Sequence, residues 1–431
     1  MPRLSTRDAD FASRFEKLLH WDEGDIGAVE RTVADIISDV RARGDEAVIA
    51  LTSRFDRIDL TPESMAFSKE EIAEARASLP EEDRKALETA AQRIWDYHTW
   101  QMPAMGMETY RDWQGAELGQ RTTPLDRVGL YVPGGLANYP SSVLMNALPA
   151  RVAGVEELIM VVPTPDGIVN PLILAAADIA GVDKVFRIGG AQAVAALAYG
   201  TDTVPSVDKI VGPGNIFVAT AKRQVFGKVG IDMIAGPSEI LVVADRHNDP
   251  RWIAADLLSQ AEHDEEARPF LITDDAGFAD RVEEAVNAHL NTLERRAICE
   301  KSLANRGGII LARDLDEACE LASQVASEHL ELAVEDPDAL LPKIRHAGAI
   351  FMGRYTPEAM GDYVAGPNHV LPTGGTARFS SPLGVHDFIK RTSIIRCTEA
   401  ATRVIGPAAS RLADREGLTA HKLSVDLRLE K

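Results

Sequence analysis

The chain has 431 residues, of which 45% are hydrophobic and 26% charged, as in ordinary folded globular proteins. Its length predicts more than one domain, because a single core seldom grows beyond about 300 residues. The 46 basic and 66 acidic residues give a net charge of −20, which argues against nucleic acid as a partner. The apolar runs fall far short of the roughly 18 residues that span a bilayer, so no membrane is expected either.

The N-terminus and the cysteines indicate a compartment. The first residues lead directly into charged sequence without the apolar segment of a secretory signal, which predicts a cytoplasmic location. Cys299, Cys319 and Cys397 form neither an even set nor a close pair. They therefore indicate neither a disulfide framework nor a thiolate zinc site, and we expect them to fill core or surface positions.

Four regions follow one another along the chain. Residues 1–125 are rich in helix formers and charge, which predicts a mostly helical N-terminal region. In residues 126–237, and again in 238–380, short apolar runs alternate with helical segments, a pattern typical of βαβ units. Residues 381–431 lose this rhythm and end in a polar, helical tail. The expected fold class is α/β, with two tandem Rossmann-like parallel-sheet domains, a helical N-terminal region and an extended C-terminal tail.

Glycines gather at predicted strand ends. They stand at Gly134-Gly135, Gly189-Gly190, Gly212-Pro-Gly214 and Gly236-Pro-Ser238. Open parallel sheets bind ligands beyond the carboxyl ends of their strands, where glycine permits close approach of the backbone. Each of these sites could also be a tight turn between a strand and a helix. The dinucleotide fingerprint GxGxxG is not matched. In a motif that begins at Gly212, Phe217 stands where the third glycine would be.

Two pairs of polar residues could carry chemistry. Gln260 and His263 are three residues apart near the end of a predicted helix, so their side chains share one face and suit a metal ion or a polar substrate. An exposed, polar helix end is the alternative. Glu328-His329 could provide a general base and a second proton-transfer group, provided that the pair lies in a bend. A simple surface pair is the alternative here.

A loop rich in glycine and proline carries Asp362, Asn368 and His369, and such a loop is more typical of a functional than of a linking segment. With Gln260, His263 and the late His421, Asp362 would complete a set of nitrogen and oxygen ligands. Such a set suits Zn²⁺, although Mn²⁺ or Co²⁺ would be tolerated. The spacing of these residues along the chain does not by itself select them.

Several longer motifs resemble the histidinol dehydrogenase family across nearly the whole chain. They include Tyr131-Val-Pro-Gly-Gly, Ile188-Gly-Gly-Ala-Gln, Val211-Gly-Pro-Gly-Asn, Leu258-Ser-Gln-Ala-Glu-His-Asp, Glu328-His-Leu-Glu, Gly361-Asp-Tyr-Val-Ala-Gly-Pro-Asn-His and Glu416-Gly-Leu-Thr-Ala-His. The resemblance implies a zinc-dependent enzyme that oxidises L-histidinol to L-histidine with NAD⁺, through L-histidinaldehyde and two successive hydride transfers, as the last step of histidine biosynthesis. It also implies a homodimer whose C-terminal tails are exchanged.

The resemblance further implies roles for single residues. The metal ligands would be Gln260, His263, Asp362 and His421, and the catalytic pair would be Glu328 and His329. The substrate contacts would be Ser238, Gln260, His263, His329, Asp362, His369, Glu416 and His421. The NAD contacts would be Tyr131, Gln192 and Asn215. Because His421 and Glu416 would serve the partner's active site, a monomer is expected to be inactive.

The chain departs from the family pattern in two places. Ser327 stands where the family usually has proline, and Pro382 and Gly384-Val-His386 replace a more usual glycine and Ser-Val-Tyr or Ser-Val-Leu. These departures concern local loop geometry and substrate fit near His386. Three other functions are the alternatives: a sister dehydrogenase of a small sulfonated diol on the same fold, a zinc hydrolase with Glu328 as base, and an inactive nucleotide-binding module. The chain keeps the histidinol pattern where the sister enzyme should differ, and the filled catalytic positions of the family disfavour the inactive module.

Overall fold

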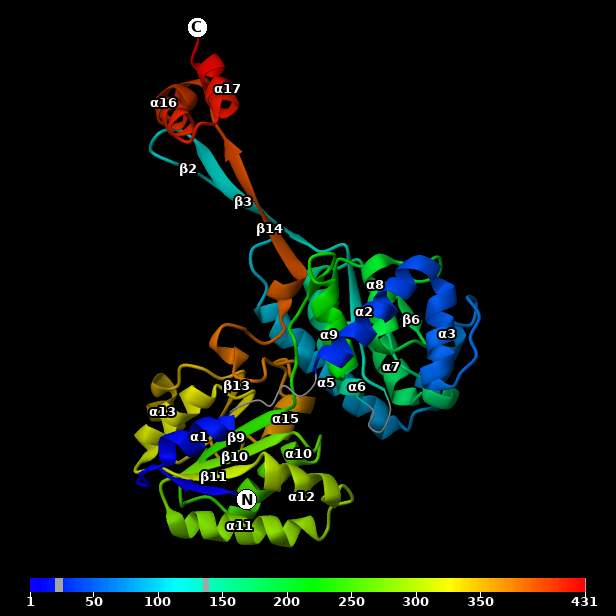
Figure 1. Cartoon of the computed structure of the whole chain (residues 1–431), viewed down its shortest axis with the longest axis vertical. Coiled ribbons are helices and arrows are strands. Elements are labelled where there is room, and N and C mark those ends of the chain that lie inside the picture. The colour runs from blue at the N-terminus through cyan, green and yellow to red at the C-terminus, as the bar shows by residue number, and fades with distance from the viewer. Residues whose placement is uncertain (20–25, 135–138, 431) are drawn as a thin grey trace.

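The computed structural model describes residues 1–19, 26–134 and 139–430. Gly135, one of the glycines expected at a strand end, lies outside these ranges. Figure 1 shows two α/β parts and a narrow arm that projects away from both of them. Among the described residues, no helix combines the length and the apolar character needed to cross a bilayer.

The first parallel sheet has five strands in the order β6-β5-β4-β7-β8. Their bounds are β4 Arg127–Tyr131, β5 Glu157–Val161, β6 Lys184–Phe186, β7 Lys209–Val211 and β8 Gly230–Ile231. Along β5, Ile159 and Val161 pack on one face, while Leu158 and Met160 pack on the other. Helices therefore cover both faces, as the continuous apolar run of this strand predicts.

The helices of this part form two layers. One layer packs with Ile159 and Val161 and consists of α2 (Ile26–Arg43), α3 (Asp45–Asp56), α8 (Gly190–Tyr199) and α9 (Ile216–Val225). The other layer consists of α4 (Lys69–Ser78), α5 (Glu81–Trp100), α6 (Pro140–Ala153) and α7 (Pro171–Ile179). Most helices predicted in the N-terminal region thus cover this first sheet.

The second parallel sheet has six strands in the order β1-β11-β10-β9-β12-β13. Their bounds are β1 Arg3–Ser5, β9 Glu239–Ala244, β10 Arg268–Thr273, β11 Gly308–Leu311, β12 His329–Ala333 and β13 Ala349–Met352. One face carries α10 (Pro250–Ala261), α11 (Ala276–Leu290) and α12 (Arg296–Asn305), and the other carries α1 (Phe11–Leu19) and α13 (Leu315–Val325). The edge strand β1 was not predicted, because three residues carry too little periodicity to be recognised.

Apart from β1, the two sheets share one strand order. The chain first adds strands on one side of β4 or β9, and then returns to continue on the other side of that strand. The α/β fold class is confirmed, and the segments in which short apolar runs alternate with helical segments form parallel sheets with helices on their faces. The limits of the four regions and the Rossmann-like description stay predictions.

The arm is a three-stranded antiparallel sheet made of β2 (Gly106–Arg111), β3 (Glu117–Pro124) and β14 (Ile389–Arg396). At its end, α16 (Glu399–Arg415) and α17 (Thr419–Leu429) pack against each other, drawn in red in Figure 1. Strand β14 pairs with β3 along its whole length. The C-terminal tail is therefore tied to a segment that lies more than 250 residues earlier.

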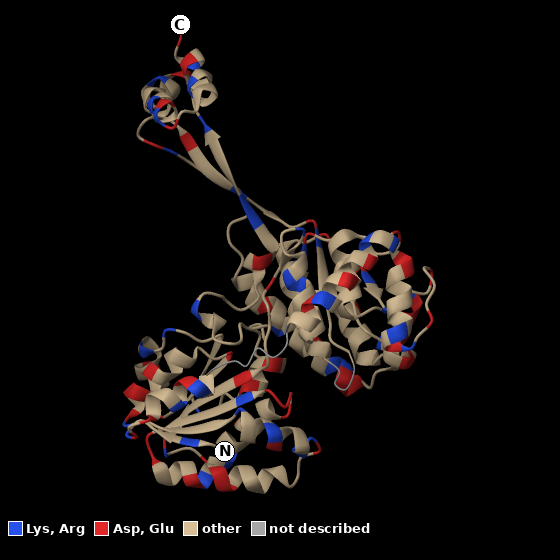
Figure 2. Ribbon diagram, in the orientation of Figure 1, with Lys and Arg blue, Asp and Glu red and all other residues tan. Residues whose placement is uncertain are grey.

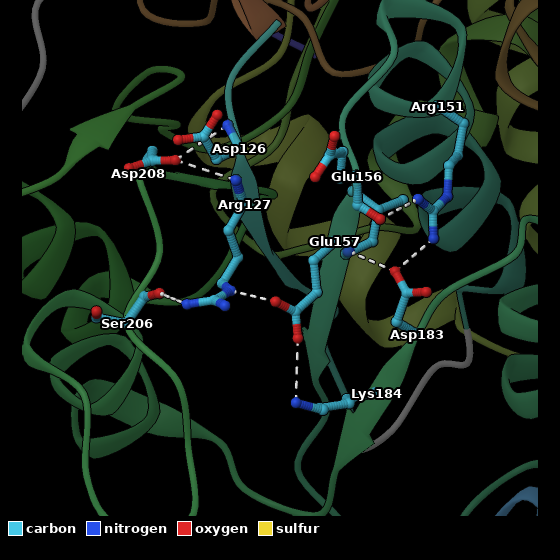
Figure 3. Close-up of polar contacts among 10 residues, drawn as sticks. Asp126, Arg127, Arg151, Glu156, Glu157, Asp183, Lys184, Ser206 and Asp208 are labelled. Carbon is cyan, nitrogen blue, oxygen red and sulfur yellow. Dashed lines mark hydrogen bonds and ion pairs between the residues drawn. The ribbon is translucent and has the colours of Figure 1, made fainter.

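Short elements complete the described chain: α14 (Pro337–Leu340), α15 (Glu358–Tyr363), and the 3₁₀ turns η1 (Pro165–Gly167), η2 (Leu341–Lys343), η3 (Thr376–Arg378) and η4 (Val385–Phe388). Figure 2 shows Lys and Arg interspersed with Asp and Glu over both α/β parts. At the amino-terminal edge of the first sheet these charges are paired (Figure 3): Glu157 accepts from Lys184 at 3.0 Å and also pairs with Arg127.

Candidate active site

A cavity of about 520 Å³ is lined by residues of both α/β parts. Asn215 borders it from beyond the carboxyl end of β7, while Ser238 and His329 border it from the amino ends of β9 and β12. The predicted site residues that line it are Asn215, Ser238, Gln260, His263, Glu328, His329, Asp362 and His369. One expectation was wrong: the Gly236-Pro-Ser238 turn leads into β9, so it lies at an amino end and not at a carboxyl end of the second sheet.

The main chain of Glu239 holds both Glu328 and His329. The Glu239 amide donates to Glu328 Oε2 at 2.9 Å, and His329 Nδ1 donates to the Glu239 carbonyl, also at 2.9 Å. Glu328 precedes the first residue of β12, so it escapes the strict alternation of a strand and both side chains reach the cavity. Both are buried, at 7% and 3% exposure, so the alternative of a surface pair is wrong.

The His329 ring is oriented for proton transfer at Nε2. Because the carbonyl partner can only accept, Nδ1 carries a proton and Nε2 is the atom that gains or loses one. His329 Nε2 lies 3.6 Å from Asp362 Oδ1 and has no hydrogen-bond partner among the described residues. Burial acts to lower the pKa of His329, but Glu358, Glu328 and Asp362 together raise it well above its ordinary value.

Three carboxyl groups surround this ring. Burial raises the pKa of Glu328 and of Glu358 to about 8 in each, against a lowering by His329. Burial also acts to raise the pKa of Asp362, but the neighbouring His329 ring holds it below its usual range. The ligand atoms of His329, Glu358 and Asp362 all lie within 4.8 Å of one another. This is a concentration of titratable groups of the kind found at catalytic sites.

Three of the four predicted metal ligands come from two helices or their ends. Gln260 is fully buried in the last turn of α10, and His263 follows the end of that helix. Asp362 comes from α15, and His369 Nδ1 donates to its carbonyl at 2.9 Å. Burial lowers the pKa of His263, which favours the neutral imidazole that a metal requires. An amide oxygen, an imidazole nitrogen and a carboxylate lining one cavity fit a zinc ion.

Two predicted residues lie elsewhere. Glu416 at the end of α16 and His421 in α17 are both exposed, and neither lines the cavity. Figure 1 shows these two helices at the tip of the arm, away from both α/β parts. His386 is exposed in η4 and is not among the described residues that line the cavity, so the expected influence on substrate fit has no support in its position. Ser327, in contrast, donates through its hydroxyl to the His329 carbonyl at 2.9 Å and so helps to fix the bend at Glu328 and His329.

A second cavity, of about 820 Å³, contains the predicted NAD contacts Tyr131, Gln192 and Asn215. Three residues, Pro133, Gly214 and Asn215, line both cavities, so the two spaces adjoin. The first turns of α8 and α9 face the second cavity through Gln192 and Phe217. Helix N-termini of this kind bind phosphate groups.

The turn before α9 depends on glycine. Gly212 has a φ of 110°, and a Cβ there would collide with the Tyr131 carbonyl oxygen. The Gly212 amide donates to Asp232 at 2.8 Å, and its carbonyl accepts from Lys222 at 2.9 Å. The buried Lys222–Asp232 pair therefore fixes the backbone that borders both cavities.

Sequence reasoning missed Glu358. It stands four residues before Asp362 on α15, so both side chains lie on one face of that helix. The i,i+4 spacing of two carboxylates after Pro357 was the available signal. Glu239, whose backbone holds Glu328 and His329, was not identifiable, because it holds them through main-chain atoms.

Two parallel-sheet parts that enclose buried histidine and carboxyl groups, beside a cavity at helix N-termini, define an α/β enzyme. Residues 20–429 match the family described as histidinol dehydrogenase. The histidinol dehydrogenases of Ruegeria pomeroyi and Cereibacter sphaeroides are 62% and 61% identical to the chain, and each alignment covers 100% of this chain and 99% of the relative. The crystal structure of histidinol dehydrogenase from Elizabethkingia anophelis has a TM-score of 0.92 at 33% identity, covering 100% of this chain and 98% of that one. The chain belongs to the histidinol dehydrogenase family and is an oxidoreductase of that type, as its motifs predicted.

Proposed function

We propose that the chain oxidises L-histidinol to L-histidine with NAD⁺, through L-histidinaldehyde and two successive hydride transfers. The observation that carries this proposal is the junction of the two cavities at Pro133, Gly214 and Asn215. A dinucleotide in the larger cavity could extend its nicotinamide past this junction toward His329. The membership in the family supports the substrate, and the reaction would be the last step of histidine biosynthesis.

Gln260, His263 and Asp362 would hold a Zn²⁺ ion, with His421 from a second subunit as the remaining protein ligand. When bound, the ion supplies a positive charge that orients the amino and imidazole groups of the substrate. Ser238 and His369 line the same cavity and would contact the substrate. Glu416 of the second subunit would do so as well.

His329 is the proposed base of both oxidations. Its Nε2 would accept the hydroxyl proton while the hydride leaves the same carbon for the nicotinamide. The bond from Nδ1 to the Glu239 carbonyl keeps the ring in position. Asp362 is one of the three carboxyl groups that raise the pKa of His329. Its engagement as a metal ligand would weaken its share, so that more of the ring is unprotonated and able to accept a proton.

Glu328 is placed for the step between the two oxidations. Water must add to the aldehyde before a second hydride can leave, and a carboxylate can take the proton of that water. The raised pKa of Glu328, about 8, allows it to exchange protons near neutral pH. Retaining the aldehyde in the cavity prevents its loss between the steps.

We further propose a cytoplasmic homodimer in which the arms are exchanged. The helices at the tip of the arm expose apolar side chains, namely Val404, Leu412, Leu418, Leu423 and Leu427. Several large apolar side chains exposed on two neighbouring helices favour a protein partner there. Exchange would bring His421 and Glu416 into the partner's cavity, which explains why a single chain leaves both outside.

The test is to count NADH formed per L-histidinol consumed by the purified, zinc-loaded protein. Two NADH per histidinol is the expected result, and one or none would contradict the proposal. Reduction of NAD⁺ with a small sulfonated diol, but not with L-histidinol, would indicate that the chain is the sister dehydrogenase. Ester or amide hydrolysis without NAD⁺ would favour a zinc hydrolase, and cofactor binding without turnover an inactive module.

A further inference from the structure

Glu358 is firmly anchored next to the cavity. It is the first residue of α15 and is 2% exposed. Its backbone amide donates at 2.7 Å to Glu331 Oε1 on β12, and the Glu331 carboxyl is hydrogen-bonded to Asp256 of α10. The position of Glu358 is thereby fixed to both the second sheet and α10.

The Glu358 carboxylate faces the Gln260 amide. In the amide orientation that satisfies both groups, Gln260 Nε2 lies 2.5 Å from Glu358 Oε1 and 3.1 Å from Oε2. Ser259 on the same helix donates to Oε2 at 3.3 Å. In its ionised form the carboxylate can only accept, so it selects the nitrogen side of the amide.

This selection matters for a metal. A primary amide coordinates a cation through its oxygen, whereas its NH₂ group is only a donor. An amide whose nitrogen is bound to Glu358 presents its oxygen on the opposite side. Without Glu358, either orientation of the Gln260 side chain would be available, and one of them would turn a donor toward the ion.

Glu358 could instead be a ligand itself, since it lies with His329 and Asp362 in one cluster. Its contacts argue against that role. Both of its oxygens are engaged by α10, and among the described residues it is not one that lines the cavity. Gln260 and Asp362, its neighbours on the two helices, do line it.

We propose that Glu358 is a positioning residue that orients the Gln260 amide, so that the amide oxygen serves as metal ligand. The proposal rests on the metal site of the proposed function. It predicts that the effect of Glu358 on the metal passes entirely through Gln260.

The test measures zinc affinity of the full-length, metal-stripped protein by competition with a coloured chelator. We expect E358L to weaken zinc binding by about 10–100-fold, the usual effect of losing an outer-shell partner. E358Q keeps an acceptor oxygen and should weaken it less. S259A, which removes the other α10 donor to the same carboxylate, is the matched control and should leave the affinity within about threefold. In a Q260L background, E358L should have no further effect.

A swap keeps the test decisive if E358L fails to fold. Q260E alone sets two buried carboxylates against each other and should weaken zinc binding, whereas Q260E with E358Q restores a donor facing an acceptor and should recover most of the affinity. Unchanged affinity in E358L, equal loss with and without Gln260, or no recovery in the swap would overturn the proposal. A wild-type chain that binds no zinc would overturn the metal site as well, so the two failures are distinguishable.

Discussion

Apart from β1, the two parallel sheets share one strand order, but the charged groups at their amino-terminal edges differ. At the first edge, Glu157 lies between Arg127 and Lys184 near solvent (Figure 3). Burial acts to raise the pKa of Glu157, but these two cations lower it below its usual value. At the second edge, burial raises the pKa of Glu239 to about 7 and that of Glu328 to about 8.

The difference shows what turns a sheet edge into a site. Paired charges near water contribute little energy and leave protonation states ordinary. Carboxyl groups buried around one histidine are costly, and they exchange protons near neutral pH. The strand order thus provides an edge in both parts, whereas burial of carboxyl groups around His329 gives the second edge groups that titrate near neutral pH.

The sharpest way to break the second edge is to remove its base. We expect H329A to lower turnover by about two to four orders of magnitude, because a positioned general base contributes that much, and to leave zinc content intact. Steady-state NADH formation and metal analysis check both results. H386A is the matched control, since His386 is exposed outside the cavity. Near-native turnover in H329A would remove His329 from its role.

A second prediction concerns His421, which lies on the arm and does not reach the cavity of its own chain. H421A and H329A should each be nearly inactive, but refolding an equal mixture should restore about a quarter of wild-type activity. Half of the dimers then carry both variants, and an exchanged arm gives each of these one intact site. Activity of the mixture is compared with that of each variant refolded alone. No recovery would contradict arm exchange.

The sequence allowed most strands of both sheets to be predicted, because buried parallel strands and the helices between them have strong periodicity. The sequence did not show which turns lie at the carboxyl ends of the strands and which lie at the amino ends. The Gly236-Pro-Ser238 turn was expected at a carboxyl end, yet it precedes β9. Local pattern identifies a turn but not which end of a sheet the turn serves, since that depends on the whole topology.

The site was predictable only through the family resemblance. Gln260, His263 and Asp362 meet in the cavity through the packing of α10 against α15, a long-range contact that spacing does not encode. Backbone groups such as the Glu239 amide and carbonyl have no signature at all. The separation of His421 from this cavity reflects an arm whose placement depends on a second chain under the proposed exchange.

A third prediction sharpens the electrostatic contrast. The pKa of Glu239 is raised from 4.5 to about 7, mainly by burial. The folded state therefore keeps a proton that the unfolded state has released, so the free energy of unfolding falls as pH rises through this window. Between pH 5 and 8, this one group should reduce the free energy of unfolding by about 2–3 kcal/mol.

The measurement is urea unfolding of metal-stripped wild type and E239Q at several pH values. The glutamine keeps an acceptor for the Gly374 amide, which bonds the carboxylate at 3.2 Å, but it does not titrate. The difference between the two proteins should therefore change with pH between 5 and 8. Parallel pH profiles would show that Glu239 titrates normally.

The smallest effect is expected at the first edge. E157Q removes a charge that pairs with Lys184 at 3.0 Å and with Arg127, but the Glu157 side chain is 24% exposed. Such pairs are worth roughly 1 kcal/mol or less, and salt screens them. We expect E157Q to lower the free energy of unfolding by that amount at low ionic strength, by less in about 1 M salt, and to leave NADH formation unchanged. A loss as large as that of a buried ion pair, about 3–5 kcal/mol, and insensitive to salt, would mean that the two edges do not differ in the way their burial indicates.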